Sequence, residues 1–259
     1  MNFEPKKHLG QNFLLDTDII RSIIDSINLE DGEEFIEIGP GHGVLTQMAV
    51  SRIKGKDKKI YAVEIDERFC RKLETMFLED SGIIIICKDV LDYLPEFSPK
   101  GEFKIFGSLP YYITSPIIHG VIKMKKQPKQ CVFLIQKEVA EKINCKAPDS
   151  SYLSSFVQTF YEVAYLGKVP ADRFDPKPEV DGGIISLERK NISYNSDFVS
   201  KYEGFLHKAY SHPRKMLNKI FTKEELEKGG INSSIRAQNL DSQQWLNFFS
   251  KLNPALYEI

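Results

Sequence analysis

Short apolar runs, separated by stretches with helical periodicity, extend from residue 34 to residue 136 of the chain. Each run is rich in Ile, Val and Phe and too short for a helix, which is typical of fully buried strands. The runs are "EFIEI" (34–38), "IYAVEI" (60–65), "IIIIC" (83–87), "FKIFG" (103–107) and "CVFLIQ" (131–136). Their alternation with helices predicts a parallel sheet in an α/β domain.

A helix is predicted ahead of the first strand. In "DTDIIRSIIDSINL", from Asp16 onward, isoleucines recur at helical spacing and form one apolar stripe, at positions 19, 20, 23, 24 and 27. Asp16 or Thr17 can cap the start of this helix. We expect its isoleucine stripe to pack on the sheet.

The last part of the chain changes character. The runs 160–169 and 182–189 follow one another without a helix between them and predict an antiparallel edge pair. A polar stretch at 188–197 then separates a first domain, residues 1–192, from a second, residues 193–259. Only helical patterns follow, over 197–210, from Pro213, over 223–228 and from Asp241. The sequence predicts a Rossmann-like domain with a small helical domain after it.

Composition narrows the setting of this protein. No stretch of its 259 residues approaches the roughly 20 apolar residues of a membrane span, and the N-terminus lacks the apolar core of a secretion signal. We therefore expect a cytoplasmic protein with no membrane partner, and nothing demands more than a monomer. The four cysteines are widely spaced, which predicts reduced packing residues, and no spacing of His, Cys or acids predicts a metal site.

Charge is uneven although the net charge is only −1. Basic residues gather in three runs, at 52–59, 123–129 and 207–219, and the last two contain no acid. A single run of this kind usually lies on a solvated face. Three runs on one chain make a nucleic-acid partner worth considering if folding brings them together.

A glycine loop, "FIEIGPGHGVLT" (35–46), follows the first strand and opens a helix. Gly39, Gly41 and Gly43 lack a Cβ atom, so the backbone can turn sharply and approach a ligand. The NAD and FAD fingerprint requires its third glycine three positions after the second, whereas Gly43 follows Gly41 by two. The spacing disfavours a dinucleotide.

Acidic residues follow the next two strands. Glu64 ends the second strand, where its carboxylate can accept hydrogen bonds from the two hydroxyls of a ribose, and Asp89 follows the third, placed to reach an adenine amino group. Open α/β sheets bind ligands at the carboxyl ends of their strands. Glycine, acid and acid on three consecutive strands indicate S-adenosylmethionine.

These features, with several others, resemble the ribosomal RNA small-subunit adenine N6,N6-dimethyltransferases (KsgA type), relatives of the macrolide-resistance rRNA methylases. The resemblance covers nearly the whole chain. It rests on "KKHLGQNFL" (6–14), "EIGPGHGVLT" (37–46), "AVEID" (62–66), "KDVLD" (88–92), "SLPYYITSPII" (108–118), "FLIQKEVAEKI" (133–143), "VPADRFDPKPEVDGGIISL" (169–187) and "HPRKMLN" (212–218).

The resemblance implies methyl transfer from S-adenosyl-L-methionine to N6 of two adjacent adenines near the 3′ end of small-subunit (16S) rRNA, in an immature 30S particle. Carried over by position, the cofactor contacts fall on Asn12, Leu14, Gly39, Gly41, Glu64, Asp89 and Ser108. The catalytic turn falls on Ser108, Leu109, Pro110 and Tyr111, and Phe174 joins it as the second ring around the extruded base. Leu14 and Phe174 can also be read as ordinary core residues.

Ser108 departs from the family pattern, which usually has Asn at this position. A serine hydroxyl offers acceptor lone pairs but is shorter than an amide and can also donate. We hypothesise that the Leu109 carbonyl carries more of the catalysis and that the rate is lower. A related hypothesis is that the chain serves as an assembly checkpoint that methylates weakly.

RNA contacts are expected from basic residues at both ends of the chain. Helical spacing after Pro213 would place Lys215 and Lys219 on one face, and the expected set is Lys6, Lys7, Arg214, Lys215 and Lys219. Two rival functions stay open: methylation of another target such as large-subunit rRNA, and RNA binding without catalysis.

Overall fold

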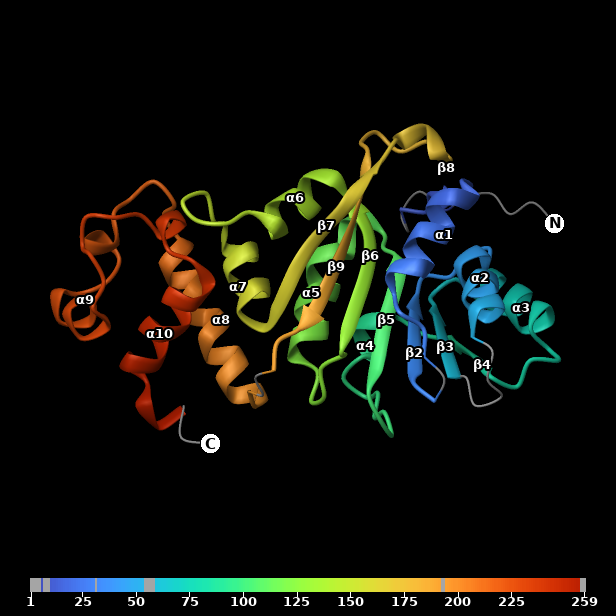
Figure 1. The fold of residues 1–259 in the computed structure, drawn as a ribbon, viewed down its shortest axis with the longest axis horizontal. Coiled ribbons are helices and arrows are strands. Elements are labelled where there is room, and N and C mark those ends of the chain that lie inside the picture. The colour runs from blue at the N-terminus through green and yellow to red at the C-terminus, as the bar shows by residue number, and fades with distance from the viewer. Residues whose placement is uncertain (1–5, 7–9, 31, 54–58, 192–193, 257–259) are drawn as a thin grey trace. The chain divides into compact units, whose positions relative to one another are not determined.

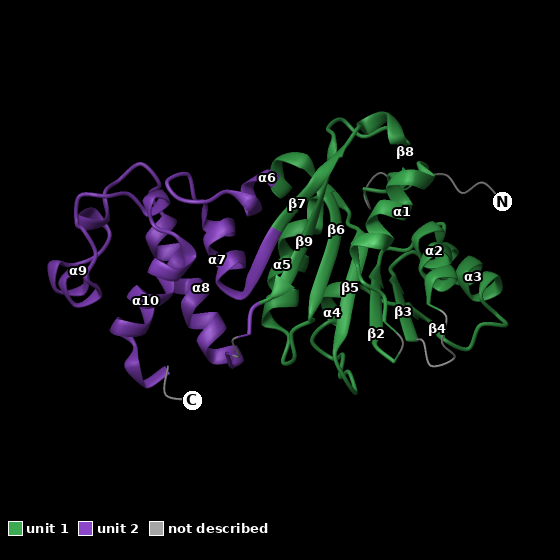
Figure 2. Ribbon diagram, viewed as in Figure 1, with its two compact units in different colours: residues 1–140, 164–189 green, residues 141–163, 190–259 purple. Residues whose placement is uncertain are grey.

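The structure is a computed structural model that describes residues 6, 10–30, 32–53, 59–191 and 194–256 (Figure 1). It divides into two compact units (Figure 2). Unit 1 comprises residues 1–140 and 164–189, and unit 2 comprises residues 141–163 and 190–259. The expected domain boundary after residue 192 lies close to the second division, whereas the grouping of 141–163 with the C-terminal helices was not expected from the sequence.

A seven-stranded sheet forms the centre of unit 1, in the order β4-β3-β2-β5-β6-β9-β7. The first five of these strands are mutually parallel, and β9 runs antiparallel to β6. The bounds are β2 Glu34–Ile38, β3 Lys59–Glu64, β4 Ile83–Cys87, β5 Phe103–Ser108, β6 Gln130–Gln136, β7 Tyr161–Val169 and β9 Gly182–Arg189. The predicted strands and the antiparallel edge are confirmed. β4 differs in being only partly buried, because it is an edge strand.

Two helices cover one face of this sheet. In α1 (Thr17–Ser26), the Asp16 carboxylate caps the first turn by accepting from the amides of Asp18 and Ile19. Its isoleucine stripe packs with α2 (Val44–Arg52) against Phe35, Phe106 and Val132. Strand residues of the opposite parity, such as Ile36, Ile105 and Phe133, are also buried, so both faces of the sheet are covered. Burial of each such side chain stabilises the fold by roughly 1.5–3 kcal/mol.

The remaining helices of the N-terminal part connect the strands, and a separate two-stranded pair lies beside the main sheet. The pair joins β1 (Phe13–Leu14) to β8 (Phe174–Asp175) in antiparallel register, although 160 residues separate Leu14 from Phe174 along the chain. The helices are α3 Glu67–Met76, α4 Val90–Tyr93, α5 Thr114–Lys123, α6 Lys137–Asn144 and α7 Tyr152–Phe160.

Unit 2 is built on α7 together with α8 (Ser196–Tyr210), α9 (Lys223–Gly229) and α10 (Ser242–Leu252). Its core is aromatic: Phe198, Tyr202, Phe248 and Trp245 are fully buried. The Tyr202 hydroxyl shares a 2.9 Å hydrogen bond with Thr159, which satisfies both polar groups inside this core. Among the helices that the structure describes, none combines the length and apolar character of a membrane span.

The segment after Pro213 is not the predicted helix. It contains one short 3-10 turn, η4 (Leu217–Lys219), and part of its backbone pairs with a segment further along the chain. Met216 forms a bridge with Arg236, and the amide of Leu217 donates to the carbonyl of Ile235 over 2.8 Å. The expectation that Lys215 and Lys219 share one helical face is therefore wrong.

The cysteines also differ from the expectation. Cys70 in α3 and Cys87 at the end of β4 form a disulfide, with their Cα atoms 5.8 Å apart, whereas Cys131 and Cys145 are free. The prediction of four reduced cysteines is wrong because it rested on spacing along the chain. Parallel pairing of β3 with β4 brings these two residues together across 17 positions.

Candidate active site

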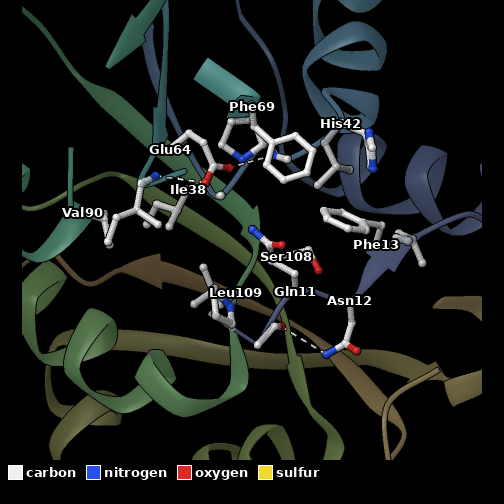
Figure 3. Close-up of a pocket in the computed structure, with 18 of the residues that line it drawn as sticks. Gln11, Asn12, Phe13, Ile38, His42, Glu64, Phe69, Val90, Ser108 and Leu109 are labelled. Atoms are coloured by element: carbon white, nitrogen blue, oxygen red, sulfur yellow. Dashed lines mark hydrogen bonds between the residues drawn. The ribbon is translucent and has the colours of Figure 1, made fainter. Parts of the chain in front are cut away.

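One cavity of about 240 Å³ in unit 1 opens at the carboxyl ends of β2, β3, β4 and β5. Figure 3 shows side chains from the N-terminal segment, the glycine loop and the end of β5 converging on it. All the residues that the sequence proposed for the cofactor and for catalysis line this cavity. They are Asn12, Leu14, Gly39, Gly41, Glu64, Asp89, Ser108, Leu109, Pro110, Tyr111 and Phe174.

The glycine loop forms one wall of the cavity between β2 and α2. Gly39, Gly41 and Gly43 all have positive φ, at 66°, 51° and 82°, a region that residues with a Cβ rarely adopt. A Cβ on Gly41 would lie 3.0 Å from the Phe13 ring, so a side chain there would crowd the N-terminal segment. The loop therefore offers bare backbone to whatever occupies the cavity.

Glu64 is held in place by backbone amides. Its Oε2 accepts from Gly41 over 3.0 Å, and its Oε1 accepts from Ile65 and Asp66 over 3.0 and 2.9 Å. Burial raises the pKa of this carboxyl, and the three amide hydrogen bonds oppose the rise. A carboxylate has about four acceptor sites. With three of these sites occupied, Oε2 retains one site for a ligand hydroxyl.

Asp89 sits at the start of α4, two residues beyond β4. Its Oδ1 accepts from the Leu91 amide over 2.8 Å, which caps the helix. Among the hydrogen bonds of the described residues, Asp89 uses only this oxygen, so Oδ2 is available toward the cavity. The carboxylates of Glu64 and Asp89 thus follow neighbouring parallel strands, as predicted.

The turn after β5 is fixed by its neighbours. The Leu109 amide donates to Leu134 in β6 over 2.9 Å, and Pro110 leads into a 3-10 turn, η2 (Tyr111–Ile113). Ser108, the last residue of β5, makes no side-chain hydrogen bond to another described residue. Burial raises the pKa of the Tyr111 phenol to about 12, with Asp181 adding to the rise, so this ring is neutral at physiological pH.

The β1–β8 pair closes one side of the cavity. Leu14 and Phe174 are 4% and 5% exposed and belong to the same apolar core as α1, although both also line the cavity. The Asn12 side chain donates to the Gly10 carbonyl over 3.2 Å, as drawn in Figure 3. Little of the Phe174 ring is open in this structure.

A buried acid that the sequence reasoning missed tethers the N-terminal segment. Asp66 accepts from Gln11 over 3.0 Å and pairs with Arg68 and Lys6 over 2.7 and 3.4 Å. Its hydrogen bonds with Arg68 hold the pKa of Asp66 well below its usual range. Asp66 lies within "AVEID", so the motif was visible, but its link to Gln11 spans 55 positions and has no sequence signal.

An aromatic cluster was also missed. Phe13 packs edge-on against His42, with ring centroids 4.4 Å apart, and both contact Phe69. His42 shares a 2.8 Å hydrogen bond with Lys72, and burial together with the charge of Lys72 lowers the pKa of this imidazole. His42 therefore serves the packing of the glycine loop against β1.

The predicted RNA-binding residues divide into three cases. Lys6 is engaged by Asp66, and Lys7 lies outside the described residues. Arg214, Lys215 and Lys219 lie on the irregular segment of unit 2, and no ion pair involves them within the part of the chain that the structure describes. The last three remain candidates for phosphate contacts.

The cavity suits S-adenosylmethionine on its own chemistry. Bare glycine backbone admits a close ligand, and Glu64 and Asp89 each retain a carboxylate acceptor that no hydrogen bond among the described residues uses. Among the described residues, no group of three His, Cys, Asp or Glu side chains could hold a metal ion.

Comparison with known proteins gives one consistent family. The family model "Ribosomal RNA adenine dimethylase" matches residues 2–253. The chain is 37% identical over 251 residues to "Ribosomal RNA small subunit methyltransferase A" of Sulfurihydrogenibium sp., covering 95% of each chain, and 36% identical over 259 residues to the protein of that name from Mycoplasmopsis pulmonis, covering 95% of this chain and 98% of the relative.

Solved structures agree on the fold. A dimethyladenosine transferase from Plasmodium falciparum superimposes with a TM-score of 0.78 at 23% identity, covering 93% of this chain and 98% of the other. The 23S rRNA methyltransferase ErmE gives 0.73 at 24% identity, covering 93% of this chain and 100% of the other. With the family model matched over nearly the whole length, the chain belongs to the ribosomal RNA adenine dimethylases, which use S-adenosylmethionine.

Proposed function

We propose that this protein dimethylates N6 of two adjacent adenines near the 3′ end of small-subunit (16S) rRNA. It acts as a monomer on an immature 30S particle in the cytoplasm, where ribosomes are assembled. The observation that carries the proposal is the cavity in which the ends of β2, β3 and β4 meet the turn 108–111. Relatives of 36–37% identity that bear the small-subunit name support the choice of RNA.

S-adenosylmethionine supplies an electrophilic methyl group when it is bound. The residues that would hold it are Asn12, Leu14, the glycine loop, Glu64 and Asp89. Glu64 would accept a ribose hydroxyl through Oε2, and Asp89 would accept from the adenine amino group. Because three backbone amides orient the Glu64 carboxylate before any ligand arrives, little ordering is left to be done on binding.

The turn 108–111 receives the substrate adenine after the base leaves its stack. The N6 amino group is a weak nucleophile because its lone pair is delocalised into the ring. Acceptors at the Leu109 carbonyl and the Ser108 hydroxyl bind the two N6 hydrogens and favour the tetrahedral geometry that frees the lone pair. Pro110 has no N–H to compete for these positions and fixes the turn.

Aromatic rings hold the extruded base. Tyr111 is half-buried at the cavity and neutral, so its ring can stack on the adenine, a contact worth about 1–3 kcal/mol per base. Phe174 would cover the opposite face once the β1–β8 pair yields enough room. Arg214, Lys215 and Lys219 contact phosphates and position the RNA without reading its sequence.

The function is tested by transfer of a tritiated methyl group from S-adenosylmethionine to small subunits whose two target adenines are unmethylated. After digestion of the RNA, the label should appear as N6,N6-dimethyladenosine. Binding of RNA with no transfer would make the chain a non-enzymatic RNA-binding factor, and label in 23S rRNA would identify another target.

A further inference from the structure

The disulfide joins Cys70 and Cys87, whose chain neighbours Phe69 and Lys88 line the proposed cofactor site. Cys87 pairs with Glu64 in the register of β3 and β4, and Asp89 follows it by two residues. The Sγ atom of Cys70 lies 3.5 Å from the Glu64 carbonyl oxygen, and the Lys88 amide donates to that same oxygen over 3.0 Å. Glu64 is therefore in direct contact with Cys70, and Asp89 is two residues from Cys87 along the chain.

The two cysteines differ in access. Cys70 is 2% exposed, whereas Cys87 is an exposed residue of an edge strand. An oxidant in solution can reach Cys87 first, and Cys70 lies within disulfide distance to complete the reaction, with Cα atoms 5.8 Å apart. An accessible cysteine beside a buried partner is the arrangement expected of a reversible redox pair.

We propose that Cys70 and Cys87 form a reversible oxidation site whose state sets the affinity of the adjacent cofactor site. The cross-link ties α3 to the end of β4 and so holds the Glu64 backbone and the Asp89 turn in the arrangement seen here. Reduction frees α3 to move relative to the end of β4, and the cofactor then has to order these two elements on binding, which lowers its affinity. The inference rests on the proposed cofactor site.

A low-molecular-weight disulfide such as oxidised glutathione is an oxidant that can reach the exposed Cys87 and accept two electrons from the cysteine pair. The Cys87 thiolate attacks one sulfur of this molecule, its S–S bond breaks, and one glutathione thiolate leaves. The Cys70 thiolate then attacks Cys87 in the mixed disulfide, the Cys70–Cys87 bond forms, and the second glutathione thiolate leaves. Two electrons pass from the cysteine pair to glutathione, and the two thiol protons end on the two released glutathiones.

The test uses the full-length protein in oxidised and reduced glutathione, with thiols counted by alkylation and mass spectrometry. In the same samples, calorimetry measures the affinity for S-adenosylhomocysteine. We expect the oxidised protein to bind about fivefold more tightly than the reduced protein, in the range usual for coupling between two sites. C70S/C87S should bind like the reduced protein in both buffers.

C145S is the matched control, because Cys145 is free and belongs to unit 2, and its binding should follow wild type in each buffer. Equal affinity of the oxidised and reduced wild-type protein would overturn the inference, as would four free thiols in oxidised glutathione. Failure to bind in both states would instead overturn the proposed cofactor site, and the switch with it.

Discussion

Ser108 is the residue at which the proposed catalytic turn departs from the family pattern. It ends β5 at the cavity, where a side-chain acceptor can reach the N6 group of the substrate, and its hydroxyl makes no hydrogen bond to another described residue. An Asn carbonyl extends further than a hydroxyl and accepts without donating. We therefore expect Ser108 to be a weaker acceptor for the substrate amino group than an Asn side chain at this position would be.

Replacement of Ser108 by Asn should accelerate single-turnover methylation of immature small subunits by about tenfold, because one better hydrogen bond in the transition state contributes roughly 1 kcal/mol. The measurement is the rate of label transfer at saturating cofactor. Ser51→Asn, at an exposed position of α2, is the control and should match wild type. A Ser108→Asn variant that methylates more slowly than wild type would contradict the hypothesis that Ser108 lowers the rate of methyl transfer.

Glu37, in β2, is a fully buried carboxyl whose polar neighbour among the described residues is Thr46. Burial raises the pKa of Glu37 from 4.5 to about 8, the charge of Glu64 adds to the rise, and nearby Thr46 opposes it. Between these values the folded chain keeps a proton that the unfolded chain has lost. The free energy of unfolding therefore falls as the pH rises from 4.5 to about 8.

Glu37→Gln removes this titration. Compared with the variant, the wild-type protein should lose about 1 kcal/mol of stability for each pH unit across that window. Urea unfolding followed by circular dichroism at pH 5, 6.5 and 8 measures the difference. Glu67→Gln serves as control, since the Glu67 side chain is 76% exposed. Wild-type and Glu37→Gln stabilities that run parallel with pH would contradict a protonated Glu37.

At the scale of elements, the close pairing of β2 with β5 brings the glycine loop and the catalytic turn together. Gly107 pairs with Ile38, and a Cβ on Gly107 would collide with the Ile38 carbonyl oxygen. Backbone cannot move aside as a flexible side chain can. Only glycine at this position lets the two strand ends approach as they do.

Gly107→Ala should therefore cost about 2–4 kcal/mol of stability, in the upper range for single substitutions. Gly101→Ala is the matched control, because no atom lies within 4 Å of a Cβ built there. Denaturant unfolding of both variants measures the cost. Equal stability of the two variants would mean that the strand pairing is looser than the structure shows.

Elements with strong local patterns were predictable, and elements made by distant pairing were not. The run "IIIIC" is recognisable by its composition, and the isoleucine stripe of α1 by its helical spacing. The structure has a strand and a helix at these two places. The prediction of a helix after Pro213 is wrong because backbone groups of this segment pair with residues further along the chain, such as Ile235. Local periodicity cannot reveal hydrogen bonds of that kind.

The same limit separates the site residues that could be predicted from those that could not. Glu64 and Asp89 follow strands, and the chain order alone places them at one edge of the sheet. Gln11 lies at the site because it donates a hydrogen bond to Asp66, and Cys70 lies beside the site because it is bonded to Cys87. These two interactions depend on how the N-terminal segment and α3 pack, which the sequence does not reveal.

At the scale of the whole molecule, RNA affinity is expected to come from phosphate contacts on unit 2. Arg214, Lys215 and Lys219 lie on a segment whose backbone is fixed by residues 233–236, so these three side chains are presented from a defined surface. Each phosphate contact releases counterions from the RNA. Binding to small subunits should therefore weaken steeply as salt rises.

Replacing all three residues by Gln should lower the affinity for immature small subunits and reduce the slope of log affinity against log salt by about one for each lost contact. Filter binding across a salt series gives both quantities. Lys201→Gln is the control, because Lys201 is paired with Asp197 over 2.8 Å. A triple variant with the wild-type salt slope would remove this segment from the RNA interface.

The position of the transferred methyl groups tests the whole account most directly. Small subunits that lack methyl groups on these adenines are incubated with the protein and S-adenosylmethionine, and RNA fragments are sequenced by mass spectrometry. The account predicts two methyl groups on each of two adjacent adenines near the 3′ end of 16S rRNA, and a rate of transfer lower by about tenfold or more with the Tyr111→Ala variant. Methyl groups elsewhere, or none with the wild-type protein, would contradict it.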